Sequence, residues 1–200
     1  MANHADVYVN DAFGTAHRAH ASTSIIADYF PNDKMFGILI ENEILSVDKV
    51  LNSNSHPLTA IVGGAKVSSK ITIISKLLDK VDHLIIGGGM AYTFIRAKGG
   101  TTGNSLFEEE LIENAKEILI IAEESGKEII LPEDSLASTD FDNNEKIKTF
   151  KTSEIEEGWM GLDIGGESIE KFNKAIISSN TIFWNGPMGV FEKEQFALGT

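Results

Sequence analysis

Short apolar segments alternate with amphipathic ones along most of this chain, and this alternation constrains its fold more than any other feature. The apolar runs occupy residues 58–62, 84–86, 128–131 and 181–184. Runs this short are typical of strands buried on both faces. Strands and helices in alternation predict a three-layer, Rossmann-like α/β fold, in which helices cover both faces of a parallel sheet.

The stretches between these runs carry apolar residues every three or four positions, which is the spacing of one helix face. We expect helices at about 71–81, 106–124 and 167–177, and an earlier helix at 40–51 after a short strand at 6–10. Ligands bind at the carboxyl ends of the strands in such sheets. A functional site is therefore expected where the strands run into their following turns.

Composition excludes several classes of protein. The formal net charge of −13 argues against a nucleic-acid partner, and the absence of cysteine excludes disulfides and thiolate metal sites. No apolar run approaches the ~18 residues of a membrane span, and the start of the chain does not resemble a signal peptide. A cytoplasmic protein is expected. The acidic segment 140–157 is predicted to be a solvated face.

The first glycine turn, at 63–66, precedes two lysines. Lys66 and Lys70 are four positions apart, so both are expected on one side of the first turn of the following helix. Cations are unfavourable at a helix N-terminus, and no carboxylate lies nearby in the sequence. The turn therefore favours a phosphate ligand, held by the lysines and by free backbone N–H groups. Two solvated surface lysines are the alternative.

Two further glycine turns follow later strands. Residues 87–89 resemble a dinucleotide fingerprint, but its third glycine is replaced by Tyr92, so a simple tight turn is equally compatible. Residues 184–192 combine a Gly-Pro corner, apolar side chains and Glu192. An apolar wall beside one acceptor suits a base and a ribose hydroxyl, although a strand cap with a buried Phe is the alternative. No metal-ligand pattern is found.

Six segments, in one order and spacing, resemble phosphoglycerate kinase. They are VNDAFGTAHRAH, GGAKVSSK, IIGGGMAYTF, SLFEEE, GWMGLDIGGES and WNGPMGVFE. The resemblance implies reversible phosphoryl transfer from 3-phosphoglyceroyl phosphate (1,3-bisphosphoglycerate) to ADP, which gives 3-phosphoglycerate and ATP. It also implies a glycolytic enzyme that is a monomer when full length and that uses Mg²⁺ with ADP or ATP.

The resemblance implies a domain organisation as well. Residues 1–37 would be the end of the N-terminal domain that binds 3-phosphoglycerate, with Arg18 and His17 near that acid. Residues 38–52 would be the hinge helix. Residues 53–200 would be the nucleotide-binding domain without its C-terminal end, where the ligand of the magnesium ion is expected.

The family's nucleotide-binding residues carry over one by one. Lys70, assisted by Lys66, would be catalytic and would contact the phosphates, and Glu192 would accept the ribose hydroxyls. The nucleotide-binding set implied by the resemblance is Gly64, Ala65, Lys66, Lys70, Gly88, Gly89, Gly161, Leu162, Asn185, Gly186, Val190 and Glu192.

The matching segments begin late and end early in the family's order, so we expect an internal fragment with little turnover by itself. Two other hypotheses remain. One is a non-catalytic nucleotide-binding module, and the other is an NAD-dependent oxidoreductase, against which the missing third glycine speaks.

Overall fold

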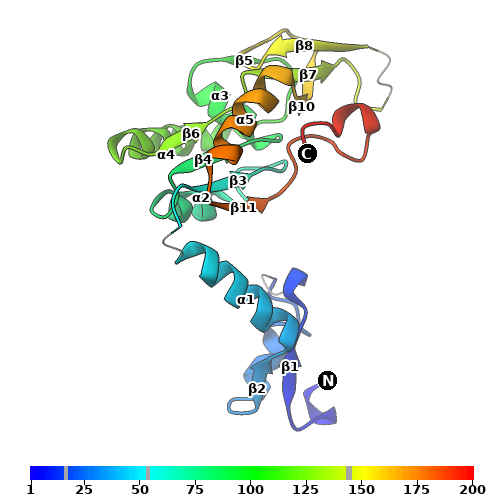
Figure 1. Ribbon diagram of the computed structural model, residues 1–200. Helices are drawn as coiled ribbons and strands as arrows, with labels where there is room; N and C mark the ends of the chain where they lie inside the picture. Colours follow the sequence, from blue (N-terminus) through cyan, green and yellow to red (C-terminus); the bar gives the residue numbers. More distant parts are fainter. Residues whose placement is uncertain (16–17, 53–54, 143–145) are drawn as a thin grey trace. The chain divides into compact units, whose positions relative to one another are not determined.

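The structure, a computed structural model, describes residues 1–15, 18–52, 55–142 and 146–200. The chain divides into two compact units, Met1–Ser53 and Asn54–Thr200 (Figure 1). Each unit is built around its own sheet, and the two are described separately below.

The first unit contains one long helix and little core. Its elements are the parallel strands β1 (Tyr8–Asn10) and β2 (Lys34–Phe36), the helix α1 (Ile38–Leu51) and short 3₁₀ helices at Ala2–His4, Phe13–Thr15 and Ile25–Tyr29. The helix expected at 40–51 is α1, whereas the strand expected at 6–10 is shorter. Asp11 accepts a hydrogen bond from the Ile40 N–H (3.0 Å) at the start of α1. Among the described hydrophobic residues of this unit, only Phe30 and Ile40 are buried.

The second unit is organised by a parallel sheet in the order β11-β3-β4-β6. Its strands are β3 (Leu58–Val62), β4 (His83–Ile86), β6 (Glu128–Ile130) and β11 (Thr181–Asn185). Its helices are α2 (Ile71–Leu78), α3 (Met90–Ala97), α4 (Ile112–Glu124) and α5 (Gly166–Ser178). The predicted α/β class and parallel sheet are confirmed, since each expected apolar run forms a strand of this sheet.

The register of the sheet fixes where its strands end. Asn185 is paired with Val62, and Val62 with Ile86. Three neighbouring strands therefore stop at the same edge, and each continues into a glycine turn.

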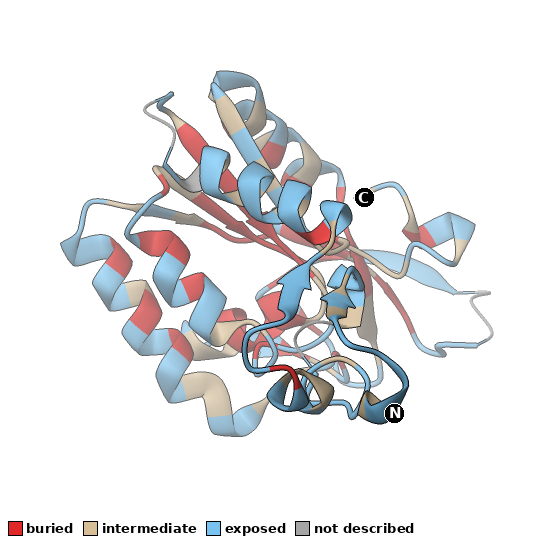
Figure 2. Ribbon diagram, turned by 90° about the horizontal axis from the view of Figure 1, so that it is seen from below, coloured by how far each residue is buried: buried red, intermediate tan, exposed pale blue. Residues whose placement is uncertain are grey.

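Both faces of the parallel sheet are buried. Ile61, Ile85 and Ile130 point to one face and pack with Phe172 and Ala175 of α5. Ala60 and Leu84, one position earlier on their strands, point to the opposite face and are also fully buried. Figure 2 shows that the strands of this sheet are largely buried and that the helices beside it expose their outer sides. The sheet edge that carries the turns is thus held by a rigid core.

A second, antiparallel sheet was not predicted. Its order is β10-β7-β8, with β7 (Asp134–Ser138), β8 (Ile147–Lys151) and β10 (Met160–Ile164), and a small parallel pair joins β5 (Thr101–Thr102) to β9 (Glu154–Ile155). The prediction that 140–157 is only a solvated face was therefore wrong. Phe150, Thr152 and Ile155 are buried, and Thr152 is hydrogen bonded to Ser135 (2.9 Å) inside the sheet.

The helix expected at 106–124 begins later than predicted. Regular α-helix starts at Ile112, after a 3₁₀ turn at Glu109–Leu111. Glu108 is extended because its N–H donates to the Thr93 hydroxyl (3.1 Å) and its carboxylate is hydrogen bonded to Ser68. Among the helices of the described residues, none combines the length and apolar character that a membrane span requires.

Candidate functional site

Three glycine turns meet at the carboxyl edge of the parallel sheet. The Gly63 N–H donates to the Asn185 carbonyl (3.0 Å), and the Gly64 N–H donates to the Pro187 carbonyl (3.0 Å). The Gly88 N–H donates to the Met188 carbonyl (3.1 Å). The turns after β3, β4 and β11 are therefore joined to one another through backbone hydrogen bonds.

Glycine is required where these turns approach most closely. Gly88 has φ +67°, and a Cβ added there would lie 2.6 Å from both the backbone N and O of Gly64. Gly186 has φ +99°, and a Cβ there would lie 2.4 Å from the Gly63 carbonyl oxygen. Only a residue without a side chain combines these backbone angles with such contacts. The turns consequently present bare backbone, which a phosphate group can approach closely.

Lys70 lies where the turns after β3 and β11 meet. Its Nζ donates to the carbonyl oxygens of Gly63 (2.7 Å) and Asn185 (3.0 Å), and to the Asn185 side-chain oxygen (2.6 Å). Burial lowers the pKa of Lys70, because desolvation disfavours the charged ammonium group. An ammonium group has three N–H donors, so all three are engaged here. The positive charge is fixed beside the turns, and direct contact with a ligand requires one of these bonds to be released.

Lys66 and Lys70 do not share the first turn of a helix, as the sequence had suggested. The chain from 66 to 70 is a turn in which the Lys70 N–H donates to the Val67 carbonyl (2.8 Å), and α2 starts only at Ile71. Lys66 is exposed, whereas Lys70 is partly buried and turned toward the strands. The two lysines thus come from one turn but have different surroundings.

A carboxylate does lie beside this turn, contrary to the prediction. Glu108 accepts a hydrogen bond from the Ser68 N–H (2.9 Å) and another from the Ser68 hydroxyl (2.5 Å). Desolvation alone would raise the pKa of Glu108, but the hydrogen bonds from Ser68 and the Val67 amide, with the charge of Lys66, lower it overall. The sequence could not reveal this contact, which joins residues 40 positions apart.

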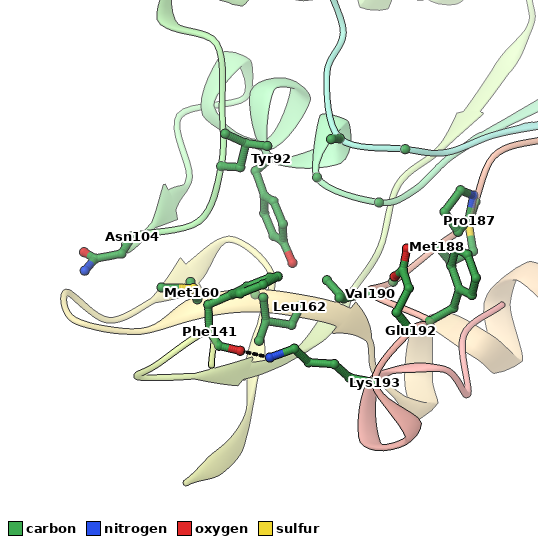
Figure 3. Close-up of a pocket in the computed structure, with 18 residues that line it drawn as sticks. Tyr92, Asn104, Phe141, Met160, Leu162, Pro187, Met188, Val190, Glu192 and Lys193 are labelled. Atoms are coloured by element: carbon green, nitrogen blue, oxygen red, sulfur yellow. Dashed lines mark hydrogen bonds between the residues drawn. The ribbon is translucent and has the colours of Figure 1, made fainter. Parts of the chain in front are cut away.

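A cavity of about 750 Å³ opens beside the three turns (Figure 3). Its lining is mainly apolar and includes Met160 and Leu162 of β10 and Val190 of the loop after β11. Glu192 brings a carboxylate to one side. A cavity of this size and character fits a nucleoside, with a few polar groups to orient it.

The loop after β11 is fixed against its neighbours where it forms one wall of the cavity. The Val190 N–H donates to the Leu162 carbonyl (2.8 Å), and the Met188 N–H donates to the Thr200 hydroxyl (3.0 Å). Asp163, below this wall, accepts from the Gly199 N–H (2.9 Å), and burial raises the pKa of its carboxyl group. The wall is thus built from three segments distant in sequence.

Most of the residues expected around the nucleotide line this cavity. Those that do are Gly64, Ala65, Gly88, Gly89, Gly161, Leu162, Val190 and Glu192. Lys66, Lys70, Asn185 and Gly186 are not among its lining residues. Of these four, Lys70, Asn185 and Gly186 lie at the turns beside it. The expected set therefore separates into a group around an apolar cavity and a group around the meeting point of the turns.

Several lining residues were missed by sequence reasoning. They are Tyr92, Asn104, Leu106, Phe141, Met160, Pro187, Met188, Gly189, Phe191 and Lys193. Phe141 precedes β8, and the Lys193 ammonium group lies 4.3 Å from its ring centre and donates to its carbonyl (Figure 3). Pro187, Met188, Gly189 and Phe191 lie in the turn at 184–192, which the sequence did single out. No local motif marks Asn104, Phe141 or Lys193.

Tyr92 explains why one predicted residue is a glycine. Burial raises the pKa of Tyr92 to about 12, so its hydroxyl stays protonated near neutral pH. A Cβ at Gly161 would lie 1.9 Å from that hydroxyl oxygen. Gly161 therefore lets β10 pass against Tyr92 at the wall of the cavity.

The residues expected to bind the acid substrate belong to the first unit. Arg18 is exposed, and its backbone carbonyl accepts from the Thr23 hydroxyl (3.1 Å). His17 lies outside the described residues. In the described part of the chain, no cluster of three or more His, Asp or Glu side chains could hold a metal ion.

Comparison with known proteins decides the family. The family model for phosphoglycerate kinase matches residues 1–200. The chain belongs to the phosphoglycerate kinase family. A phosphoglycerate kinase of Porphyromonas gingivalis is 53% identical over 201 residues and covers all of this chain, and a chloroplastic one of Volvox carteri is 48% identical over 200.

Solved phosphoglycerate kinase structures agree with this fold. That from Coxiella burnetii matches with a TM-score of 0.83 at 38% identity, over 100% of this chain and 52% of its own. That from Pyrococcus horikoshii matches with a TM-score of 0.80 at 29% identity, over 97% and 49%. The chain spans about half the length of the relatives it matches, namely 48% of the P. gingivalis protein and 43% of the V. carteri protein.

Proposed function

We propose that this chain supplies the nucleotide-binding part of a phosphoglycerate kinase. The enzyme moves a phosphoryl group between 3-phosphoglyceroyl phosphate and ADP, giving 3-phosphoglycerate and ATP. In this proposal residues 53–200 bind the nucleotide, 38–52 form the hinge, and 1–37 belong to the acid-binding domain with Arg18 and His17. The complete enzyme acts as a cytoplasmic monomer, as the family resemblance implies.

One observation carries the proposal. Lys70 and three glycine turns from in-register strands meet beside an apolar cavity of about 750 Å³. The cavity accepts the adenine between Gly161, Leu162 and Val190, and Glu192 accepts the ribose hydroxyls. The phosphates then extend toward the bare backbone of Gly64, Gly88 and Gly186, with Gly89 and Ala65 at the junction.

The proposed chemistry needs charge stabilisation rather than a protein nucleophile. An oxygen of the ADP β-phosphate attacks the phosphorus of the acyl phosphate, and the carboxylate of 3-phosphoglycerate leaves. No proton moves, because both the attacking oxygen and the leaving group are anionic. Lys70, assisted by Lys66, neutralises charge on the group in transit, as is general for phosphoryl transfer.

The ammonium group of Lys70 occupies a fixed position. The carbonyls of Gly63 and Asn185 hold its ammonium group at the edge of the sheet before any ligand arrives. Exchange of the Asn185 side-chain oxygen for a phosphate oxygen replaces one neutral acceptor by a charged one. A hydrogen bond between two charged groups is the stronger of the two.

Magnesium enters this proposal as part of the nucleotide substrate. Mg²⁺ typically keeps several waters and is held by substrate phosphates and one or two carboxylates. The described residues of this chain offer no acidic cluster at the turns. The ion is therefore proposed to arrive on the phosphates of ADP or ATP, with a protein ligand outside this chain.

Replacement of Lys70 tests the function. In the full-length protein, Lys70→Met should lower kcat by about 10²-fold, equivalent to about 3 kcal/mol of transition-state stabilisation. The matched control is Lys76→Met, which replaces an exposed lysine in the last turn of α2 and should retain full activity. A coupled assay of ATP formation measures both. Wild-type turnover by Lys70→Met would refute the assignment, and tight binding of NAD but not ADP would favour an oxidoreductase.

A further inference from the structure

Glu108 hydrogen bonds the turn between β3 and α2 from a segment 40 positions further along the chain. Its carboxylate takes both the N–H (2.9 Å) and the hydroxyl (2.5 Å) of Ser68. Ser68 lies midway between Lys66 and Lys70. The turn that carries both lysines is thus tied at its centre by a residue from another part of the chain.

Glu108 is itself held by two further contacts nearby. Its N–H donates to the Thr93 hydroxyl on α3 (3.1 Å), and Thr93 is fully buried. The ring of its neighbour Phe107 lies 4.8 Å below the Arg96 guanidinium, also on α3. Glu108 lies in an extended segment just before the 3₁₀ turn, and these contacts anchor that segment to α3. Its carboxylate therefore has a fixed position beside the turn.

The same segment also forms part of the cavity. Leu106 and Asn104 line it, and the Ser105 hydroxyl accepts a hydrogen bond from the Gly161 N–H (2.9 Å). Residues 104–108 therefore connect the wall of the base cavity with the turn at Ser68. A single segment sets the spacing between the two parts of the proposed nucleotide site.

The charge of Glu108 is unfavourable for the ligand that this site is proposed to bind. A carboxylate beside a phosphate site repels the phosphates, and it partly neutralises Lys66, whose charge acts on it. If charge alone mattered, the site would bind phosphates better without it. Its two hydrogen bonds to Ser68 offer a compensating contribution, because an ordered turn loses less conformational entropy when the ligand binds.

We propose that Glu108 is a positioning residue for the phosphate-binding turn: through Ser68 it holds Lys66, Lys70 and the intervening backbone in the arrangement that binds the diphosphate of the nucleotide. This inference rests on the proposed function and deepens it. It assigns Glu108 no contact with the substrate, and its effect is confined to ligands that carry phosphates.

Two substitutions of Glu108 separate positioning from charge. Glu108→Ala removes the negative charge and both hydrogen bonds, whereas Glu108→Gln removes the charge but keeps an acceptor for the Ser68 N–H and a donor for its hydroxyl. Electrostatics alone predicts that both variants bind MgADP more tightly. Positioning predicts that Glu108→Ala binds MgADP about tenfold more weakly, and that Glu108→Gln binds it at least as tightly as the wild type.

Isothermal titration calorimetry with MgADP and with adenosine provides the test. Adenosine lacks phosphates, so its affinity should be unchanged in every variant. Glu109→Ala, which removes a neighbouring exposed charge, is the matched control and should bind both ligands normally. Ser68→Ala should weaken MgADP binding in the same direction, and adding it to Glu108→Ala should have little further effect.

These binding measurements distinguish the positioning role of Glu108 from the proposed nucleotide-binding function on which it rests. Weaker binding of MgADP alone by Glu108→Ala, restored in Glu108→Gln, supports the inference. MgADP affinity in Glu108→Ala equal to or above the wild type overturns it, and so does an equal loss for MgADP and adenosine. If Glu108→Ala does not fold, Ser68→Ala decides by the same criteria. Failure of the wild-type chain to bind MgADP overturns the proposed function and with it this inference.

Discussion

Replacing Gly88 by alanine perturbs the point where the three turns approach most closely. The new Cβ would meet the backbone of Gly64 at 2.6 Å and the Pro187 carbonyl oxygen at 2.9 Å, and neither can move independently of the sheet. The left-handed backbone angle costs an alanine about 1–2 kcal/mol, and overpacking adds about 1–3 kcal/mol. We expect Gly88→Ala to lower the free energy of unfolding by about 2–5 kcal/mol.

Gly126 provides a matched control for the backbone angle. Its φ of +64° is close to the +67° of Gly88, but a Cβ there would meet nothing within 4 Å. Gly126→Ala should therefore lower the free energy of unfolding by only about 1–2 kcal/mol, the cost of the backbone angle alone. The difference between the two variants, about 1–3 kcal/mol, isolates the steric cost at the meeting point of the turns.

Urea denaturation followed by tryptophan fluorescence measures both variants. The only two tryptophans, Trp159 and Trp184, lie in the second unit, so the signal reports the unfolding of that unit. Equal m-values would show that the change lies in stability and not in compactness. Equal midpoints for Gly88→Ala and Gly126→Ala would refute the reasoning, because the close approach of the turns would then have no energetic consequence.

The remaining predictions concern residues that stabilise the second unit, which carries the site. Asp134→Ala should lower the free energy of unfolding by about 2–4 kcal/mol in urea denaturation, because the buried carboxylate accepts from the N–H (2.8 Å) and the hydroxyl (2.7 Å) of Ser168 at the start of α5. Phe196→Ala should cost about 3–5 kcal/mol in the same assay, since Phe196 is fully buried beside the C-terminal segment. The hydrogen bond from His56 and one from a backbone amide lower the pKa of Asp82 below its ordinary 3.8. The Asp82 carboxylate therefore contributes to folding stability above about pH 4, and this contribution is lost as the pH falls through its lower folded-state pKa. The difference in free energy of unfolding between wild type and Asp82→Asn should consequently shrink from about pH 5 to about pH 2. A difference that stays constant over that range would contradict the assignment.

The parallel sheet could be predicted because burial on both faces leaves a mark in the sequence. Residues 58–62 are apolar or small throughout, and all five positions are buried in β3. The turns that follow are marked by glycine, because their backbone angles favour a residue without a Cβ. The location of the site at this edge of the sheet could also be predicted, because ligands bind at the carboxyl ends of parallel strands.

The antiparallel sheet could not be predicted in the same way. Strand β7 (Asp134–Ser138) is largely polar, yet most of it is buried, because Asp134 and Ser135 find partners on Ser168 and Thr152. Such strands satisfy their polar groups with each other, and no apolar alternation results. Strand β8 (Ile147–Lys151) buries only Phe150, so its sequence resembles a solvated segment.

The turn that carries Lys66 and Lys70 shows which features of the site could not be predicted from the sequence. The spacing of Lys66 and Lys70 predicted that both lie on one side of a helical turn, which was wrong because α2 starts only at Ile71. Their orientation depends on partners far along the chain. Asn185 engages Lys70, and Glu108 engages Ser68 between them. Contacts of this kind arise only when the sheet brings distant segments together.

The central claim is that the phosphates of a nucleotide lie against the backbone of the three turns. A titration of ¹⁵N-labelled protein with MgADP, followed by NMR, measures this directly through the glycine amides. The account predicts large shifts for Gly64, Gly88 and Gly186, with Gly126 and Gly158 unchanged. Binding that leaves the resonances of those three amides unshifted, while other resonances shift, would contradict the claim.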